Sequence, residues 1–222
     1  MAEVPQDPHK KRYQSLRQQQ RQAAILATAR SMLAEDGYES TTIRSLAERA
    51  KVAPGTLYNL YRSKDELIHA AVADLLDEIG ERAARLAPSG LPRMLYLASE
   101  SRNTIVGNPA YALAMSKAVF KADEDDALNA KLYMRTYDYA GEQLMIAQQA
   151  DMLIETDLEP YLTHLTTLPW GCLMAWAKGA FTLEQLADEY LRVYQFVLTP
   201  ALTEQGHEVM RSWLETQSNI YS

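Results

Sequence analysis

The chain has 222 residues, of which 47% are hydrophobic and 23% charged, and its formal net charge is −7. This composition is ordinary for a folded protein, and the length allows one large domain or a small domain plus a larger one. A single cysteine, Cys172, excludes an internal disulfide and fits a reducing compartment. No apolar run reaches the ~18 residues of a membrane span, and the N-terminus lacks the apolar core of a secretory signal. We therefore expect a cytoplasmic protein without membrane contacts.

The N-terminal segment, residues 1–14, is polar and contains proline, which predicts a disordered basic tail. Its cluster His9-Lys10-Lys11-Arg12 is either a solvated tail or an arm that lies along DNA. A helix is predicted from about Leu16 to Glu35, with Gly37 as its left-handed cap. The core stripe of this helix consists of apolar residues at helical spacing: Ile25, Leu26, Ala29 and Leu33.

Residues 41–64, TTIRSLAERAKVAPGTLYNLYRSK, predict two short helices joined by a tight turn and followed by the start of a third. Pro54 suits the first position of the second helix because its φ is fixed. Leu57 can pack back on the first helix. Small, hydroxyl and amide groups then face outward: Gly55, Thr56, Tyr58 and Asn59. A short docked helix with such an outer face is what a helix-turn-helix needs to enter a major groove.

The charge distribution favours nucleic acid over a helical hairpin that binds none. Residues 9–64 contain 11 Lys and Arg against 4 Asp and Glu, a net charge of +7, so the remaining residues carry −14. A basic block within an acidic protein is typical of a phosphate-binding surface.

The same residues closely resemble the DNA-binding domain of the tetracycline-repressor (TetR) family, over about residues 17–72. The motifs that carry the resemblance are Gly37-Tyr38, Thr41-Thr42-Ile43-Arg44, Leu46-Ala47, Pro54-Gly55-Thr56-Leu57-Tyr58, and Tyr61-Arg62-Ser63-Lys64 with Leu67 beyond. The resemblance implies an all-α fold. Its parts are a helix-turn-helix DNA-binding domain at 15–64, a connecting helix at 65–87, and a helical effector-binding and dimerisation domain at 91–222.

Two positions depart from the family pattern. Lys51 stands where the family usually has Gly, and it bears a cost on the order of 1 kcal/mol if the turn needs a positive φ. Ala53 stands where the family often has Ser, which forfeits a helix cap worth roughly 1 kcal/mol.

Each candidate DNA contact has a chemical reason. Thr42 and Thr56 offer hydroxyls to phosphates, and Arg44 can reach a phosphate or a guanine edge. Asn59 is the preferred base reader, because an amide can pair bidentately with adenine. The full set is Thr42, Arg44, Pro54, Gly55, Thr56, Tyr58, Asn59, Tyr61 and Lys64. For Tyr61, a buried ring is an equal alternative, because the family usually has a core Phe there.

The rest of the chain predicts only helices. Ser63 and Glu66 predict a capping box for a helix that runs to about Ala87 and ends at Pro88. Further helices are expected at about 91–106, 109–121, 126–152, 158–178, 183–198 and 204–216. Thr182 and Gln185 predict a second capping box, and Pro169 predicts a kink or a break. The acidic run at 123–126 is interpreted as a solvated helix start rather than a metal loop.

One module makes too few contacts to select a site, so we expect a homodimer that reads a palindromic operator in double-stranded DNA. The expected dimer contacts are Leu162, Leu165, Leu173, Trp176, Leu183, Leu186, Leu191 and Tyr194. The alternative is that these side chains fill the core of the monomer. The resemblance also implies an effector pocket, which suits a small, mostly apolar molecule. Its candidate lining is Tyr111, Met115, Tyr133, Tyr137, Met145, Trp170 and Met174.

The sequence contains no catalytic, metal-binding or cofactor-binding pattern. The four His are scattered, Cys172 has no metal-spaced partner, and no phosphate-cradling glycine loop or nucleophile elbow is present. We therefore expect a repressor that releases DNA when a small molecule binds, with no cofactor, no metal and no enzymatic activity. An activator of the same fold, a nonspecific DNA-coating protein, and an all-α ligand-binding protein or enzyme are the alternatives.

Overall fold

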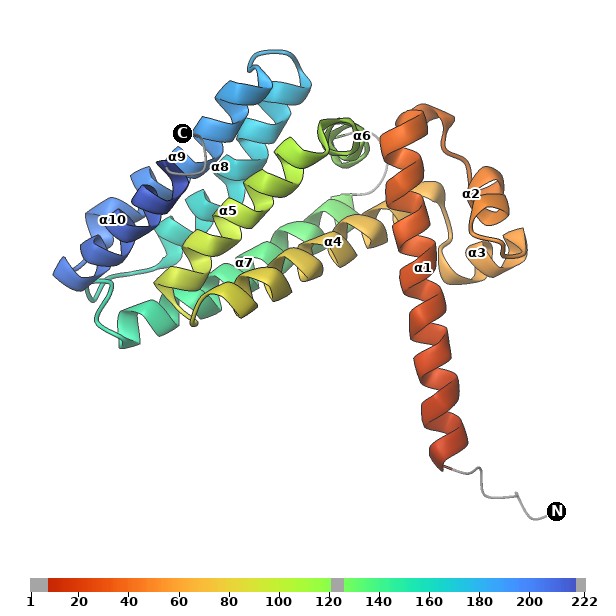
Figure 1. The fold of residues 1–222 in the computed structure, drawn as a ribbon, viewed down its shortest axis with the longest axis horizontal. Helices are drawn as coiled ribbons and strands as arrows, with labels where there is room; N and C mark the ends of the chain where they lie inside the picture. The colour runs from red at the N-terminus through yellow and green to blue at the C-terminus, as the bar shows by residue number, and fades with distance from the viewer. Residues whose placement is uncertain (1–7, 121–125, 219–222) are drawn as a thin grey trace.

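The computed structural model describes residues 8–120 and 126–218. Within these ranges the regular structure is helical, with one 3₁₀ turn at Thr199–Ala201 and one isolated bridge, Leu153 to Leu202 (Figure 1). The helices are α1 Pro8–Ser40, α2 Ile43–Arg49, α3 Pro54–Leu60, α4 Lys64–Leu86, α5 Leu91–Gly107, α6 Pro109–Val119, α7 Asp126–Gln149, α8 Glu159–Ala177, α9 Leu183–Leu198 and α10 Glu204–Ser218. The all-α prediction is confirmed. Among the described helices, none has the length and apolar character that a bilayer crossing requires.

Helix α1 begins earlier than the sequence predicted. It starts at Pro8 rather than about Leu16, so residues 8–14 are helical and not a disordered tail, while 1–7 lie outside the described residues. Figure 1 shows the N-terminal part of α1 running past α3 and away from the rest of the molecule. Residues 17–24 are exposed, and the buried part of the helix starts at Ile25.

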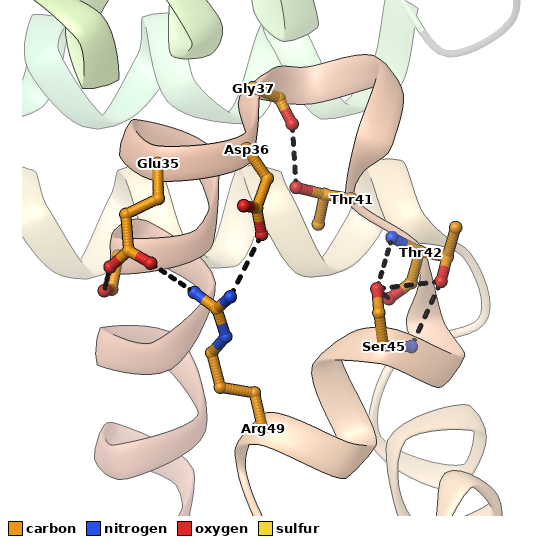
Figure 2. Close-up of polar contacts among 8 residues, drawn as sticks. Glu35, Asp36, Gly37, Thr41, Thr42, Ser45 and Arg49 are labelled. Atoms are coloured by element: carbon orange, nitrogen blue, oxygen red, sulfur yellow. Dashed lines mark hydrogen bonds and ion pairs between the residues drawn. The ribbon is translucent and has the colours of Figure 1, made fainter.

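Gly37 interrupts α1 near its end. Its φ of 76° is positive, as predicted, but its ψ of 173° differs from that of a left-handed helical cap. This backbone region is open essentially only to glycine, which explains the residue type. The Thr41 hydroxyl donates to the Gly37 carbonyl at 2.8 Å and secures the turn into α2 (Figure 2).

Helices α1 to α3 and the first turns of α4 form a small head with its own core. Helix α3 is only two turns long and would be marginal alone, because helix nucleation is costly. Burial of its Leu57, which is 0% exposed, contributes about 2 kcal/mol toward docking it. The core of the head comprises Ile25, Leu26, Ala29, Met32, Ile43, Leu46, Ala47, Leu57, Tyr61, Leu67 and Ala71.

Helix α4 continues without interruption from the head into the body. Its Leu67 belongs to the head core, whereas its Ile68 and Val72 pack in a second cluster with residues of α6. Arg30 of α1 also donates to Asp74 and, at 2.6 Å, to Glu78, both on α4. Burial alone would lower the pKa of Arg30, but the two carboxylates outweigh it and raise that pKa.

The body packs α5 and α7 to α10 around a third cluster that includes Leu95, Leu144 and Trp213. Trp213 donates its indole N–H to the Ser99 hydroxyl at 2.8 Å, which satisfies a buried polar group. Helix α8 runs continuously through Pro169, so the break considered from the sequence is wrong.

The two predicted capping boxes differ in outcome. Thr182 and Gln185 exchange both expected bonds at the start of α9, which confirms that prediction. Ser63 accepts from the Glu66 amide at 3.0 Å, but the Glu66 carboxylate accepts from the Arg62 amide at 2.8 Å, so only half of that box forms.

Candidate nucleic-acid interface and ligand cleft

The start of α2 is held by a capping box that the sequence analysis did not identify. The Ser45 amide donates to the Thr42 hydroxyl at 3.1 Å, and the Thr42 amide donates to the Ser45 hydroxyl at 3.1 Å (Figure 2). Both Thr42 and the neighbouring Arg44 are exposed. The expected phosphate contacts of these two residues would therefore come from a fixed helix start.

An ion-pair cluster joins α2 to the end of α1. Arg49 contacts Glu35 at 2.6 Å and Asp36 at 3.3 Å (Figure 2). A hydrogen bond from Ser31, followed by the contact with Arg49, lowers the pKa of Glu35. Exposed pairs of this kind add little stability.

The turn between α2 and α3 has the strain that the sequence predicted. Lys51 has a φ of 55°, and the Val52 amide donates to the Ala47 carbonyl at 2.9 Å, as in a Schellman cap. Ala53 makes no side-chain cap for α3, which is also confirmed.

Helix α3 presents the expected outer face. Leu57 is fully buried beneath it, Tyr58 is 58% exposed, and Pro54, Gly55 and Asn59 are exposed. A Cβ added at Gly55 would meet nothing within 4 Å in the chain itself. Packing within the protein therefore does not require a glycine at this position. A glycine does suit a backbone that a ligand or another chain approaches closely.

Two of the candidate contacts are placed differently from the expectation. Tyr61 is 4% exposed and belongs to the head core, which is the alternative to a DNA contact that the sequence left open. Its ring fills the position where the family usually has Phe, and its hydroxyl accepts from Gln22 at 3.3 Å. Lys64 is half-buried, donates to the Tyr38 carbonyl at 3.0 Å, and lies 3.9 Å from the centre of the Tyr38 ring. These contacts hold its ammonium group beside the first turn of α4.

The body contains a cleft of about 670 Å³ between α4, α5, α7, α8 and α9. A narrower chamber of about 60 Å³ continues inward to α6. The two spaces share the lining residues Leu76, Ile79, Ser101, Pro169, Trp170 and Tyr190. The combined size lies in the range of small-molecule sites.

Three of the seven predicted ligand residues line this space. Tyr111, Met115 and Trp170 do so. Tyr133, Tyr137, Met145 and Met174 are absent from the lining, and the last two are 53% and 44% exposed.

The face of α7 that lines the cleft is not the one the sequence analysis chose. Thr136, Tyr139, Ala140 and Gln143 face the cleft at helical spacing. Tyr194 of α9 also lines the cleft, although it was expected at the dimer interface, and Tyr190, for which the sequence predicted no role, lines it too.

The cleft combines an apolar interior with a charged rim. The hydroxyls of Tyr111 and Tyr139 are buried without hydrogen-bond partners among the described residues, and burial raises the pKa of both. Burial also raises the pKa of Tyr190 to about 12. The rim carries Asp77, Glu81, Asp138 and Glu142 together with Arg93 and Arg135. In the described part of the chain, no group of three or more His, Cys, Asp or Glu side chains is arranged to hold a metal ion.

Most of the predicted dimer residues belong to the monomer core. Six of them are 9% exposed or less: Leu162, Leu165, Leu173, Leu186, Leu191 and Tyr194. Trp176 and Leu183 are half-buried and pack against the cluster beneath α6. The exposed apolar residues of α8 and α9 are instead Leu168, Met174 and Phe196, the last with 78% of its surface exposed. The expected stripes cover the protein's own core, which is the alternative that the sequence left open.

The head and the body together define a helix-turn-helix protein whose head is joined by one long helix to a helical body with a cleft. Residues 25–71 match the model of a family described as bacterial regulatory proteins, tetR family. This match covers α2 and α3 with the adjoining parts of α1 and α4, which make up the head.

Individual relatives agree. The HTH-type transcriptional repressor KstR of Rhodococcus jostii (strain RHA1) is 34% identical over 50% of this chain and 52% of its own length. This chain spans about half the length of the first curated relatives it matches. A TetR transcriptional regulator from Rhodococcus sp. RHA1 has the same fold, with a TM-score of 0.66 and 21% identity over 82% of this chain and 97% of that one. FadR of Thermus thermophilus, a TetR-family repressor solved with lauroyl-CoA, also has this fold, with a TM-score of 0.62. It is 21% identical over 82% of this chain and 96% of that one.

Proposed function

We propose that this protein is a repressor that binds a palindromic operator as a homodimer and releases it when a small, mostly apolar molecule occupies the cleft. The observation that carries the proposal is the outer face of α3, where Gly55, Tyr58 and Asn59 are exposed above the buried Leu57. A two-turn helix docked by one leucine, with the amide of Asn59 and the phenol of Tyr58 exposed, has the chemistry for reading base edges in a major groove.

The roles proposed at this surface follow from residue chemistry. Asn59 reads a base through its amide, while Thr42, Arg44 and Thr56 contact phosphates and so position the head. Lys64 adds a cation beside the N-terminus of α4, where free amides and the helix dipole favour phosphate. Tyr58 and Pro54 complete the contact surface around Gly55.

The exposed apolar residues of α8 and α9 support a dimer interface there. Phe196, Leu168 and Met174 leave apolar area in contact with water, which a second copy can cover. The Phe196→Glu change should place a charge in that interface and give a monomer by light scattering. The Gln195→Glu change, at the adjacent exposed position, should leave a dimer. A Phe196→Glu protein that stays dimeric would remove this interface from consideration.

The cleft supports a ligand with an elongated apolar part, because a wide outer space leads to a narrow chamber lined by Val72, Ile105 and Met115. FadR, whose fold is shared, was solved with an acyl-CoA, and we infer an apolar chain of comparable shape for this protein. Release follows by a population shift, because α4 forms one wall of the cleft and also part of the head core.

DNA binding is tested by fluorescence anisotropy with genomic fragments at moderate salt. We expect selective binding to a fragment with an inverted repeat, and an Asn59→Ala protein that has lost most of this selectivity. If the wild-type chain prefers no fragment over bulk DNA, the proposed function is wrong.

Release is tested with a variant that fills the cleft. The Leu76→Trp change should leave operator binding intact and abolish the response to apolar ligands, because Leu76 lines both the cleft and the inner chamber. Leu86→Trp is the matched control, since that position is on the same helix but 56% exposed and outside the lining. An unaltered response in Leu76→Trp would place the effector elsewhere. A promoter-fusion assay then separates repression from activation.

A further inference from the structure

The N-terminal part of α1, residues 8–24, which we call the α1 extension, precedes the part of the helix that is buried in the head. Residues 17–24 are exposed, whereas the buried stripe begins at Ile25. In Figure 1 this segment stands clear of the body and passes beside α3. Residues 17–22 reach α3 and the head only along one side, where Gln22 donates to the Tyr61 hydroxyl at 3.3 Å.

The composition of the α1 extension indicates an anionic partner. Its 17 residues, 8–24, include five Lys and Arg and no Asp or Glu. The first turn of α1 contains no acidic residue. Carboxylates normally stabilise this end of a helix through its dipole, so an all-cationic start gains most from an external anion.

The position of the α1 extension places it next to the recognition helix. Arg17 and Arg21, one turn apart on the same face, line a groove of about 350 Å³ together with Thr56 and Leu60 of α3. Both arginines are exposed. A duplex seated against the outer face of α3 would therefore lie within reach of two long cationic side chains.

We propose that the α1 extension is a second DNA-contact surface, in which Arg17 and Arg21 bind backbone phosphates that flank the base pairs read by α3. The proposal rests on the proposed function, because it needs α3 to be seated on DNA. The helix has 14 residues from Pro8 to Arg21, which span about 20 Å, or roughly six phosphate spacings of one strand measured along the duplex axis. Phosphate contacts fix position but carry no sequence information.

The test compares two charge-matched double variants of the full chain. Arg17→Gln with Arg21→Gln removes the proposed contacts and keeps helix propensity, since Gln and Arg are similar helix formers. Arg85→Gln with Arg211→Gln removes two exposed cations at the end of α4 and on α10, away from the head (Figure 1). Operator affinity is measured from about 50 to 200 mM salt, and helicity by circular dichroism confirms that both variants fold.

Four lost contacts in a dimer should reduce the slope of log K against log salt by about 3.6, at roughly 0.9 per contact. The affinity of Arg17→Gln/Arg21→Gln at about 0.1 M salt should fall at least tenfold, with the same preference for operator over scrambled DNA, while the control keeps the wild-type slope. Equal slopes for the two variants, or a changed sequence preference in the first, would overturn this inference alone. A wild-type chain with no affinity for any duplex would overturn the proposed function as well.

Discussion

The strained turn between α2 and α3 gives a quantitative prediction. Lys51 occupies the left-handed position of a Schellman cap, with a φ of 55°. A residue with a Cβ pays about 1–2 kcal/mol in this conformation, and glycine avoids that cost but loses about 0.5–1 kcal/mol of chain entropy. Lys51→Gly should therefore stabilise the protein by about 1 kcal/mol, or about 2–4 °C in Tm for a chain of this size.

Two comparisons isolate the cause. Lys51→Ala removes the charge but keeps the Cβ, so its Tm should stay close to that of the wild type. Asp151 has the same φ of 55° at the end of α7, where the Met152 amide donates to the Ala147 carbonyl at 2.9 Å. Asp tolerates this region better than Lys, so Asp151→Gly should stabilise by a smaller amount, about 0.5 kcal/mol. Thermal unfolding followed by circular dichroism measures all three. If Lys51→Gly is no more stable than Lys51→Ala, the strain argument fails.

Three further predictions concern stability. Gly206→Ala should destabilise by about 1–3 kcal/mol in urea titrations, because its Cβ would lie 2.1 Å from the Met152 carbonyl oxygen. Gly107→Ala, which would meet nothing within 4 Å, is the neutral control, and equal losses in both would refute the packing argument. Ala53→Ser should raise Tm by supplying the missing cap of α3, worth about 1 kcal/mol; an unchanged Tm would contradict this. Because folding raises the pKa of Tyr190 from 10.0 to about 12, the contribution of this group to stability should be constant below pH 10 and should be lost as pH rises toward 12. Ultraviolet titration should show that this tyrosine ionises later than a free one.

The head could be predicted in detail because its determinants are local. Pro54 sets the start of α3, Leu57 docks it, and the strain at Lys51 and the missing cap at Ala53 follow from residue type at known positions. Tyr61 shows the limit of this reasoning. Whether its ring points outward or inward depends on how much space α1 leaves beside it, and in the structure that space is large enough for the whole ring.

The body could be predicted as helices but not as surfaces. Helical spacing identified the stripe of Leu186 and Tyr194 correctly, but spacing does not say whether a stripe is covered by the same chain or by a partner. The same limit explains why Tyr139 was missed while Tyr133 was chosen, since both lie on α7 and differ only in which neighbour they face. The contacts proposed with DNA, effector and a second copy stay predictions.

The unbroken course of α4 constrains how this architecture can be recombined. Leu67 anchors one end of the helix in the head, and Ile79 lines the cleft three turns later. Inserting one residue between them would rotate the cleft side by about 100° relative to the head, whereas seven residues would nearly restore the phase but move it by about 10 Å. Hybrid regulators that exchange heads between relatives should therefore keep the number of residues between these two positions fixed. Hybrids in which this number changes should fold but should not release DNA in response to the ligand proposed for the cleft.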